Sequence, residues 1–182
     1  MARYELRFAG FGGQGVITAG FVLACAASLH DGRYATMTQS YGPESRGGAC
    51  RADVIISDKP VDYPKTSRLN CLAAMSSDAY SQFQGEIAAR GIVVYEESLV
   101  SIPVTDRRKD VSYRGVGAVD AAVELGSPLS ANMVILGSVV EITKAASPEG
   151  VRKVIGERFP RQTEINLEAF ERGRELARST AS

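Results

Sequence analysis

GFGGQG, at residues 10–15, follows the apolar segment YELRFA and precedes a segment rich in Ala and Val. It fits G-x-G-x-x-G, the pattern of strand-to-helix turns in dinucleotide-binding folds. Glycine accepts positive φ and lets backbone N–H groups approach a ligand or another chain closely. The N-terminus of the following helix favours an anion. The stretch therefore predicts a strand, a tight turn and a helix, as at the start of a Rossmann-like sheet.

The rest of the chain alternates strand and helix patterns. Strands are predicted at residues 3–9, 33–38, 50–57, 71–75 and 91–95, with a further candidate at 102–105. Helices are predicted at residues 13–29, 76–89, 116–125, 130–145, 148–159 and 164–178. This alternation predicts an α/β fold, Rossmann-like and doubly wound, with a mostly parallel sheet and helices on both faces. We expect a Rossmann-like domain over residues 1–160 and a C-terminal helical arm over 161–182.

Composition excludes several classes of protein. A chain of 182 residues with 45% hydrophobic residues suits one domain with a real core. The 21 basic and 21 acidic residues cancel, which counts against a nucleic-acid or membrane-surface partner. No apolar run approaches the roughly 18 residues that span a bilayer, and the N-terminus shows no signal-peptide pattern. We expect a cytoplasmic protein.

The metal-binding and nucleophilic residue types are few. The three cysteines, Cys25, Cys50 and Cys71, lie far apart, which excludes a C-x-x-C motif and a disulfide framework. The single histidine, His30, falls near the end of the first predicted helix. One histidine and no paired cysteines are too few for the usual zinc site and make a Ser-His-Asp triad improbable. We therefore predict no metal ligand and no catalytic residue.

The GFGGQG stretch lacks the second residue signal that usually accompanies a nucleotide-binding glycine loop. The NAD fingerprint needs an acidic residue about 20 positions on, at the end of the second strand. That strand runs out into Thr38 and Gln39, whereas Asp31 comes too early, and no Lys-Ser/Thr follows the glycines as in a P-loop. A stand-alone nucleotide- or small-anion-binding module using the glycine loops is the alternative function.

A second glycine-rich loop, QSYGPESRGG at residues 39–48, follows the second strand. In a doubly wound sheet it projects from the same carboxyl edge as the first loop. Arg46 could hold a carboxylate or phosphate with two hydrogen bonds, and Tyr41 offers a flat face and a hydroxyl. The alternative is a tight turn that closes on itself, with Glu44 and Arg46 solvated.

Together the two loops resemble a known family. GFGGQGV followed by TQSYGPESRGGACRADVIISD resembles the gamma subunit of 2-oxoacid:ferredoxin oxidoreductases, and the second loop is most similar to that of the 2-oxoglutarate (2-ketoglutarate) enzyme. SANMVILGSVVE, at residues 130–141, and the helical tail extend the resemblance over essentially the whole chain. The pyruvate and branched-chain enzymes carry related but different loops.

The resemblance implies a complex that oxidises a 2-oxoacid with coenzyme A to acyl-CoA (here succinyl-CoA) and CO2, reducing ferredoxin. It implies thiamine diphosphate with Mg²⁺ and [4Fe–4S] clusters on the alpha, beta and ferredoxin-like delta subunits. Three scattered cysteines cannot supply the four thiolates of such a cluster. The isolated chain is therefore expected to bind no cofactor and to be inactive, and its exposed partner surface could drive a homodimer.

The resemblance also implies an architectural chain that packs on the thiamine-binding subunits and faces coenzyme A. The candidate contacts lie in the two loops and near the start of a later helix: Gly10, Gly12, Gly13, Gln14, Gly15, Ser40, Tyr41, Gly42, Pro43, Glu44, Arg46, Gly47, Gly48 and Asn132. Arg46 is the first choice for a charged contact, to a partner carboxylate or a coenzyme A phosphate. Asn132 could equally be an ordinary helix cap.

The last predicted helix is highly charged. Its charges could be a solvated face with i to i+4 pairs. Its apolar residues, Ile165, Leu167, Phe170 and Leu176, must still be buried against something. An arm across a neighbouring subunit is the alternative.

Overall fold

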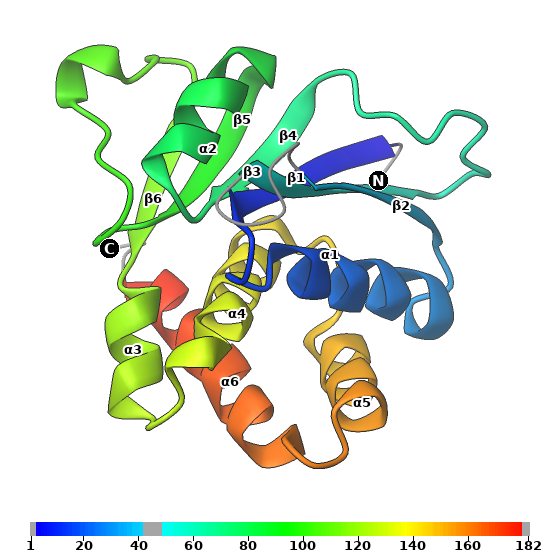
Figure 1. The fold of residues 1–182 in the computed structure, drawn as a ribbon. Coiled ribbons are helices and arrows are strands. Elements are labelled where there is room, and N and C mark those ends of the chain that lie inside the picture. The colour runs from blue at the N-terminus through cyan, green and yellow to red at the C-terminus, as the bar shows by residue number, and fades with distance from the viewer. Residues whose placement is uncertain (1–2, 42–48, 180–182) are drawn as a thin grey trace.

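The computed structural model describes residues 3–41 and 49–179 (Figure 1). Its strands are β1 (Arg3–Phe11), β2 (Tyr34–Ser40), β3 (Ala49–Ser57), β4 (Leu69–Ala74), β5 (Ile87–Glu96) and β6 (Ser112–Val116). Its α-helices are α1 (Val16–Cys25), α2 (Ser77–Phe83), α3 (Ala118–Glu124), α4 (Ala131–Thr143), α5 (Pro148–Arg158) and α6 (Thr163–Ser179). A π-helical turn, Ala26–His30, extends α1.

The strands form one six-stranded sheet in the order β2-β3-β1-β4-β5-β6. β4 pairs in parallel with both β1 and β5, and β6 pairs in parallel with β5. β3 is antiparallel to both of its neighbours, β1 and β2. A parallel crossover needs a dozen or more residues, and the β2–β3 connection is shorter, so β3 turns back beside β2. The expected mostly parallel sheet is confirmed, with β3 inserted between β1 and β2.

Helices cover both faces of the sheet, as predicted, but unequally (Figure 1). α2 lies on one face, where Leu72 and Phe83 belong to the smaller hydrophobic core. α1 and α3 to α6 lie on the other face, where Phe8, Leu23 and Ile135 belong to the larger core. Strand residues alternate between these two cores because successive side chains of a strand point to opposite faces.

In the middle of the chain, two sequence predictions were wrong and one strand was missed. The helix predicted at 76–89 ends at Phe83, and β5 already begins at Ile87, because Gly85 interrupts the helical pattern. The candidate strand at 102–105 is a loop with a single 3₁₀ turn, Val104–Asp106, after a proline that cannot donate to a ladder. β6 was missed because its sequence, SYRGV, is largely polar and only Val116 is buried.

The C-terminal helix α6 packs on α4 through two glycines. A Cβ at Gly173 would collide with the carbonyl oxygen of Val134, and a Cβ at Gly137 would collide with that of Phe170. The hydroxyl of Ser138 also donates to the Gly173 carbonyl at 2.7 Å. Phe170 is fully buried in the main core. The two backbones therefore touch, and the apolar face of α6 lies on its own chain.

Charged residues of α6 also bind across the helical layer. Glu141 on α4 accepts hydrogen bonds from Arg174 at 2.9 Å and from Arg178 at 3.0 Å, and a third from Lys144 at 2.6 Å. Arg178, Lys144 and Arg174 together lower the pKa of Glu141 from 4.5 to about 2. Some charged residues of α6 thus form ion pairs with α4, so the charges of α6 do not all belong to a solvated face.

This network predicts acid sensitivity. Because the folded pKa of Glu141 lies below its unfolded value, its contribution is complete above 4.5 and is lost as pH falls towards 2. We expect Glu141→Gln to remove this part of the acid destabilisation, about 1 kcal/mol, since solvent screens the exposed partners. Urea unfolding from pH 6 to pH 2 measures this pH dependence of the free energy of unfolding. The control is Glu149→Gln, which removes an exposed i,i+3 ion pair with Arg152. Equal pH slopes for Glu141→Gln and the unmodified chain would contradict this assignment.

Candidate functional site

The glycine loop joins β1 to α1 as the sequence predicted. Gly13 has φ 98° and Gly15 has φ 73°, in the left-handed region that favours glycine. Gly15 is the N-cap residue, immediately before α1. The loop therefore leaves the carboxyl end of a strand next to the middle of the sheet, which is where α/β folds place ligand contacts.

The side chain of Gln14 turns back towards the sheet. The Phe11 N–H donates to its side-chain oxygen at 2.7 Å, and its amide nitrogen donates to the Met75 carbonyl, just after β4, at 2.9 Å. A Cβ at Gly10 would collide with the same Gln14 oxygen. Gln14 thus connects the ends of two parallel strands, and Gly10 provides the space for its side chain.

Asn132 holds the other end of the loop. Its amide donates to the Gly15 carbonyl at 3.2 Å, and its side chain occupies the space that a Cβ at Gly15 would need. The residue that precedes α4 is Ser130, so Asn132 is not a helix cap. It is 6% exposed and connects α4 to the first turn of α1.

We predict that Asn132→Ala loosens the loop without unfolding the chain. It removes a hydrogen bond and leaves a small gap, for a loss of about 1–2 kcal/mol in the free energy of unfolding. Hydrogen exchange should rise at residues 12–16 while the α6 amides stay protected. Asn70→Ala, which removes a different hydrogen bond, to the Glu5 backbone, is the matched control. Unchanged exchange at the loop in Asn132→Ala would refute the positioning role.

Gly12 and Gly13 are the outward part of the loop. A Cβ at either glycine would meet no atom within 4 Å. Both are exposed, whereas Gly10 is buried. The four predicted glycines therefore divide into two kinds, because Gly10 and Gly15 are needed for packing and Gly12 and Gly13 present open backbone.

The second loop begins at the same edge of the sheet. Ser40, at the end of β2, pairs with Arg51 of β3, and Gly10, near the end of β1, pairs with the adjacent Cys50. Tyr41 follows and is 66% exposed. The remaining candidates of this loop lie outside the described residues: Gly42, Pro43, Glu44, Arg46, Gly47 and Gly48.

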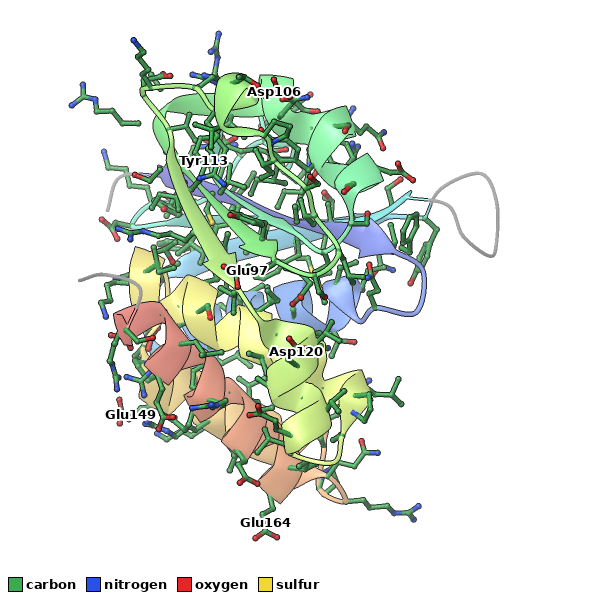
Figure 2. The ribbon with its side chains drawn as sticks, turned by 90° about the vertical axis from the view of Figure 1, so that its left-hand side faces the viewer. Glu97, Asp106, Tyr113, Asp120, Glu149 and Glu164 are labelled. Carbon is green, nitrogen blue, oxygen red and sulfur yellow. The ribbon has the colours of Figure 1, made fainter. Side chains whose placement is uncertain are left out.

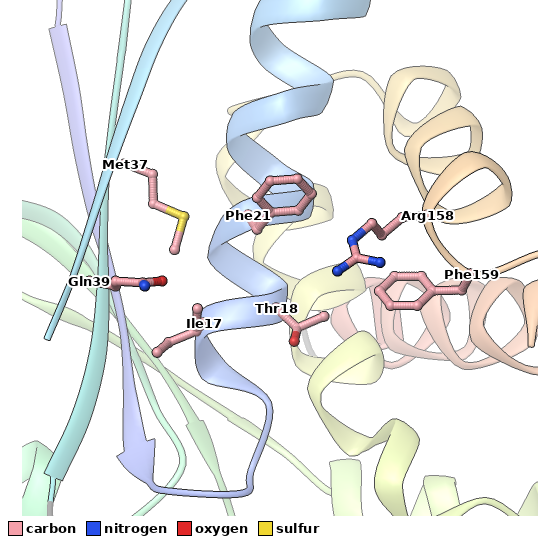
Figure 3. Close-up of a pocket in the computed structure, with 7 residues that line it drawn as sticks. All are labelled: Ile17, Thr18, Phe21, Met37, Gln39, Arg158 and Phe159. Carbon is pink, nitrogen blue, oxygen red and sulfur yellow. The ribbon is translucent and has the colours of Figure 1, made fainter. Parts of the chain in front are cut away.

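Two hollows flank the glycine loop and α1. One, of about 300 Å³, is bordered by Gly13, Gly15 and Asn132 together with Leu129, whose side chain is 87% exposed. The second, of about 220 Å³, lies over α1 and is bordered by β2 on one side and the end of α5 on the other; its lining residues are Ile17, Thr18, Phe21, Met37, Gln39, Arg158 and Phe159 (Figure 3). The Arg158 guanidinium lies 5.9 Å from the centre of the Phe21 ring. Sequence reasoning did not find this second hollow.

The one buried carboxylate at the end of β5 has a structural role. Glu96 accepts hydrogen bonds from the Ala118 N–H at 2.7 Å and the Val119 N–H at 3.0 Å, at the start of α3. Its other oxygen accepts from the Ser98 hydroxyl at 2.7 Å. Glu96 is fully buried and was missed by sequence reasoning, since its position in the pattern carries no signal.

Within residues 3–41 and 49–179, no group of three His, Cys, Asp or Glu side chains is placed to hold a metal ion. In the same described part of the chain, no helix is both long and apolar enough to cross a membrane.

The chain matches known proteins over nearly its full length. Residues 5–176 match the family model of pyruvate ferredoxin/flavodoxin oxidoreductase. The 2-oxoglutarate synthase subunit KorC of Methanocaldococcus jannaschii is 42% identical over 97% of this chain and 95% of that subunit. The gamma subunit of a keto/oxoacid ferredoxin oxidoreductase from Geobacter sulfurreducens is 36% identical, with a TM-score of 0.87 over 98% of both chains.

A larger protein shares the fold. The 2-oxoglutarate:ferredoxin oxidoreductase of Magnetococcus marinus, solved with 2-oxoglutarate, coenzyme A and succinyl-CoA bound, matches with a TM-score of 0.89 at 24% identity. The match covers 98% of this chain but 32% of that one. The same fold therefore occurs both as a separate subunit and as part of a longer chain.

Proposed function

This chain belongs to the pyruvate ferredoxin/flavodoxin oxidoreductase family, and we propose that it is the gamma subunit of a 2-oxoglutarate:ferredoxin oxidoreductase. The observation that carries the proposal is the end-to-end match to separate KorC subunits of 2-oxoglutarate synthases, at 42% identity. The resemblance of both glycine loops points the same way. The pyruvate synthase subunit PorC of Methanothermobacter thermautotrophicus is less similar, at 33% identity.

The complex oxidises 2-oxoglutarate with coenzyme A to succinyl-CoA and CO2, and ferredoxin accepts the electrons. Thiamine diphosphate with Mg²⁺ supplies the decarboxylation chemistry, and [4Fe–4S] clusters carry the electrons. We assign these groups to the alpha, beta and delta subunits. This chain's residues do not fit a cluster, because it has three cysteines where four thiolates are needed. Burial moreover raises the pKa of the Cys71 thiol to about 12.

The proposed role of this chain is supported by the glycine loop at residues 10–15. Gln14 and Asn132 hold the loop from inside, so that Gly12 and Gly13 present a fixed backbone surface. A surface without side chains allows close approach of another chain or of coenzyme A. Tyr41 and Arg46 of the second loop complete the proposed contact, with Arg46 bound to a partner carboxylate or a coenzyme A phosphate. A cytoplasmic location is part of the same proposal.

Reconstitution tests this role. The isolated chain should contain no thiamine or iron and should not reduce a low-potential dye. The other subunits without this chain should lose at least tenfold in 2-oxoglutarate- and CoA-dependent activity, and adding the chain should restore it. Full activity without the chain would overturn the proposal.

A further inference from the structure

The hollow of about 300 Å³ beside the glycine loop joins segments that lie far apart in the sequence. They are the glycine loop with the first turn of α1, the residues around the start of α4, and the junction of α5 and α6. None of the described residues that line it is charged, and the lining mixes glycines, hydroxyls, carboxamides and apolar side chains. Sites for phosphates or carboxylates usually present Arg or Lys side chains. The lining of this hollow therefore favours a neutral group.

Two buried carboxamides line the hollow, and each uses one of its two polar atoms within the chain. The Asn132 nitrogen donates to the Gly15 carbonyl at 3.2 Å, and the Asn166 oxygen accepts from the Ser130 hydroxyl at 3.3 Å. Across the two described ranges, no hydrogen bond engages the Asn132 oxygen or the Asn166 nitrogen. Asn132 is 6% exposed and Asn166 is 8% exposed. Because a buried polar group without a partner is unfavourable, a group that enters the hollow must offer a donor to Asn132 and an acceptor to Asn166.

An exposed apolar side chain borders the same hollow. Leu129 is 87% exposed, although its turn, Pro128–Ser130, is held by hydrogen bonds. The Ser130 N–H donates to the Ser127 carbonyl at 2.8 Å, and the hydroxyls of these two serines lie 2.8 Å apart. Ile165 of α6 is partly buried and belongs to the same lining. A fixed apolar side chain next to a hollow is the kind of anchor that a partner protein buries.

We propose that this hollow binds an uncharged peptide segment of a neighbouring subunit of the complex. The inference rests on the proposed function. A peptide unit carries one N–H donor and one carbonyl acceptor, which match the Asn132 oxygen and the Asn166 nitrogen. An apolar side chain of the segment packs on Leu129 and Ile165.

The position of the hollow favours a subunit segment over a small molecule. Gly13 borders the hollow and also belongs to the outward part of the glycine loop. A subunit that packs on the glycine loop, as the proposed function requires, therefore reaches the hollow as well. A small molecule inside the hollow would leave most of Leu129 in water, whereas a folded chain covers both the hollow and its rim.

Binding of the full-length chain to the other subunits of the complex, followed by titration and by recovery of activity, tests this inference. We expect Leu129→Asp to weaken binding at least 100-fold with an unchanged circular dichroism spectrum, because the side chain is already exposed in the isolated chain. The matched control is Val104→Asp, since Val104 is 79% exposed and shares a 3₁₀ turn with Asp106. Figure 2 shows Asp106 on the other side of the sheet from Asp120 of α3 and Glu164 of α6. The control should bind as tightly as the unmodified chain.

Asn166→Asp tests the carboxamide separately. Aspartate keeps an oxygen that accepts from Ser130 but replaces the nitrogen donor with a second acceptor, so binding should weaken at least tenfold. Hydrogen exchange of the unmodified chain gives a readout that needs no substitution. Amides of residues 127–133 and 163–167 should be protected when the other subunits bind, and those of residues 104–108 should not change.

The outcomes separate this inference from the proposed function. If the unmodified chain binds and restores activity but Leu129→Asp binds equally tightly, the inference is wrong and the proposed function stands. Normal assembly of Leu129→Asp with a raised KM for coenzyme A also overturns the inference, because a small molecule would then occupy the hollow. If the unmodified chain does not bind the other subunits, the inference and the proposed function are both wrong.

Discussion

Gly173→Ala is expected to lower the free energy of unfolding by about 3–5 kcal/mol, a large part of the roughly 5–15 kcal/mol that holds a domain folded. The new Cβ would collide with the Val134 carbonyl, which is backbone and cannot rotate away. The helices α4 and α6 would have to separate, exposing Phe170 and breaking the hydrogen bond from Ser138. Urea unfolding measures the loss.

The matched control is Gly156→Ala. Gly156 also lies inside a helix, α5, but its Cβ would meet only a methyl group of Thr163 at 3.8 Å. Alanine should stabilise this helix by about 0.5–1 kcal/mol, because glycine is the poorer helix former. If both variants unfolded at the same urea concentration, the backbone contact between α4 and α6 would not carry the stability assigned to it.

Gly12→Val is expected to leave the chain folded and to lower activity of the assembled complex at least 100-fold. Gly12 has open space around it and an ordinary φ, so valine strains nothing within the chain. Gly13→Val is a poorer test because Gly13 has φ 98°, which valine avoids. The expected loss comes from the partner or coenzyme A that the side chain keeps away.

Gly85→Val is the control for this prediction. Gly85 is also open within 4 Å, but it precedes β5, at the amino edge of the sheet. The measurements are the thermal midpoint of each isolated variant, its incorporation into the complex, and kcat/KM for coenzyme A and for 2-oxoglutarate. Normal assembly and turnover with Gly12→Val would show that the glycine loop is not a contact surface.

The first unit of the fold was predictable because its signals are local. A strand pattern, glycines at a tight turn and an Ala- and Val-rich helix stand next to each other in the sequence. The reversal of β3 could have been read from the short connection after Ser40, which leaves no room for a crossover helix. β6 could not, because a polar edge strand lacks the apolar alternation that marks half-buried strands.

The candidate site was predictable in place but not in the role of each residue. Glycine spacing located the loop, yet nothing local shows that Gln14 turns inward to Met75 or that Asn132 reaches Gly15, since both contacts join distant segments. The crossing of α4 and α6 did leave a signal. A lone glycine inside a helical pattern, as at Gly137 and Gly173, often marks close packing.

The most direct test is native purification of the tagged chain from its source, followed by assay of the eluate. The assay follows CoA-dependent reduction of a low-potential dye with 2-oxoglutarate, pyruvate or 3-methyl-2-oxobutanoate. We predict co-purifying subunits that contain thiamine diphosphate and iron–sulfur clusters, with activity highest on 2-oxoglutarate. A chain that purifies without such partners, or a complex that prefers another 2-oxoacid, would contradict the proposed function.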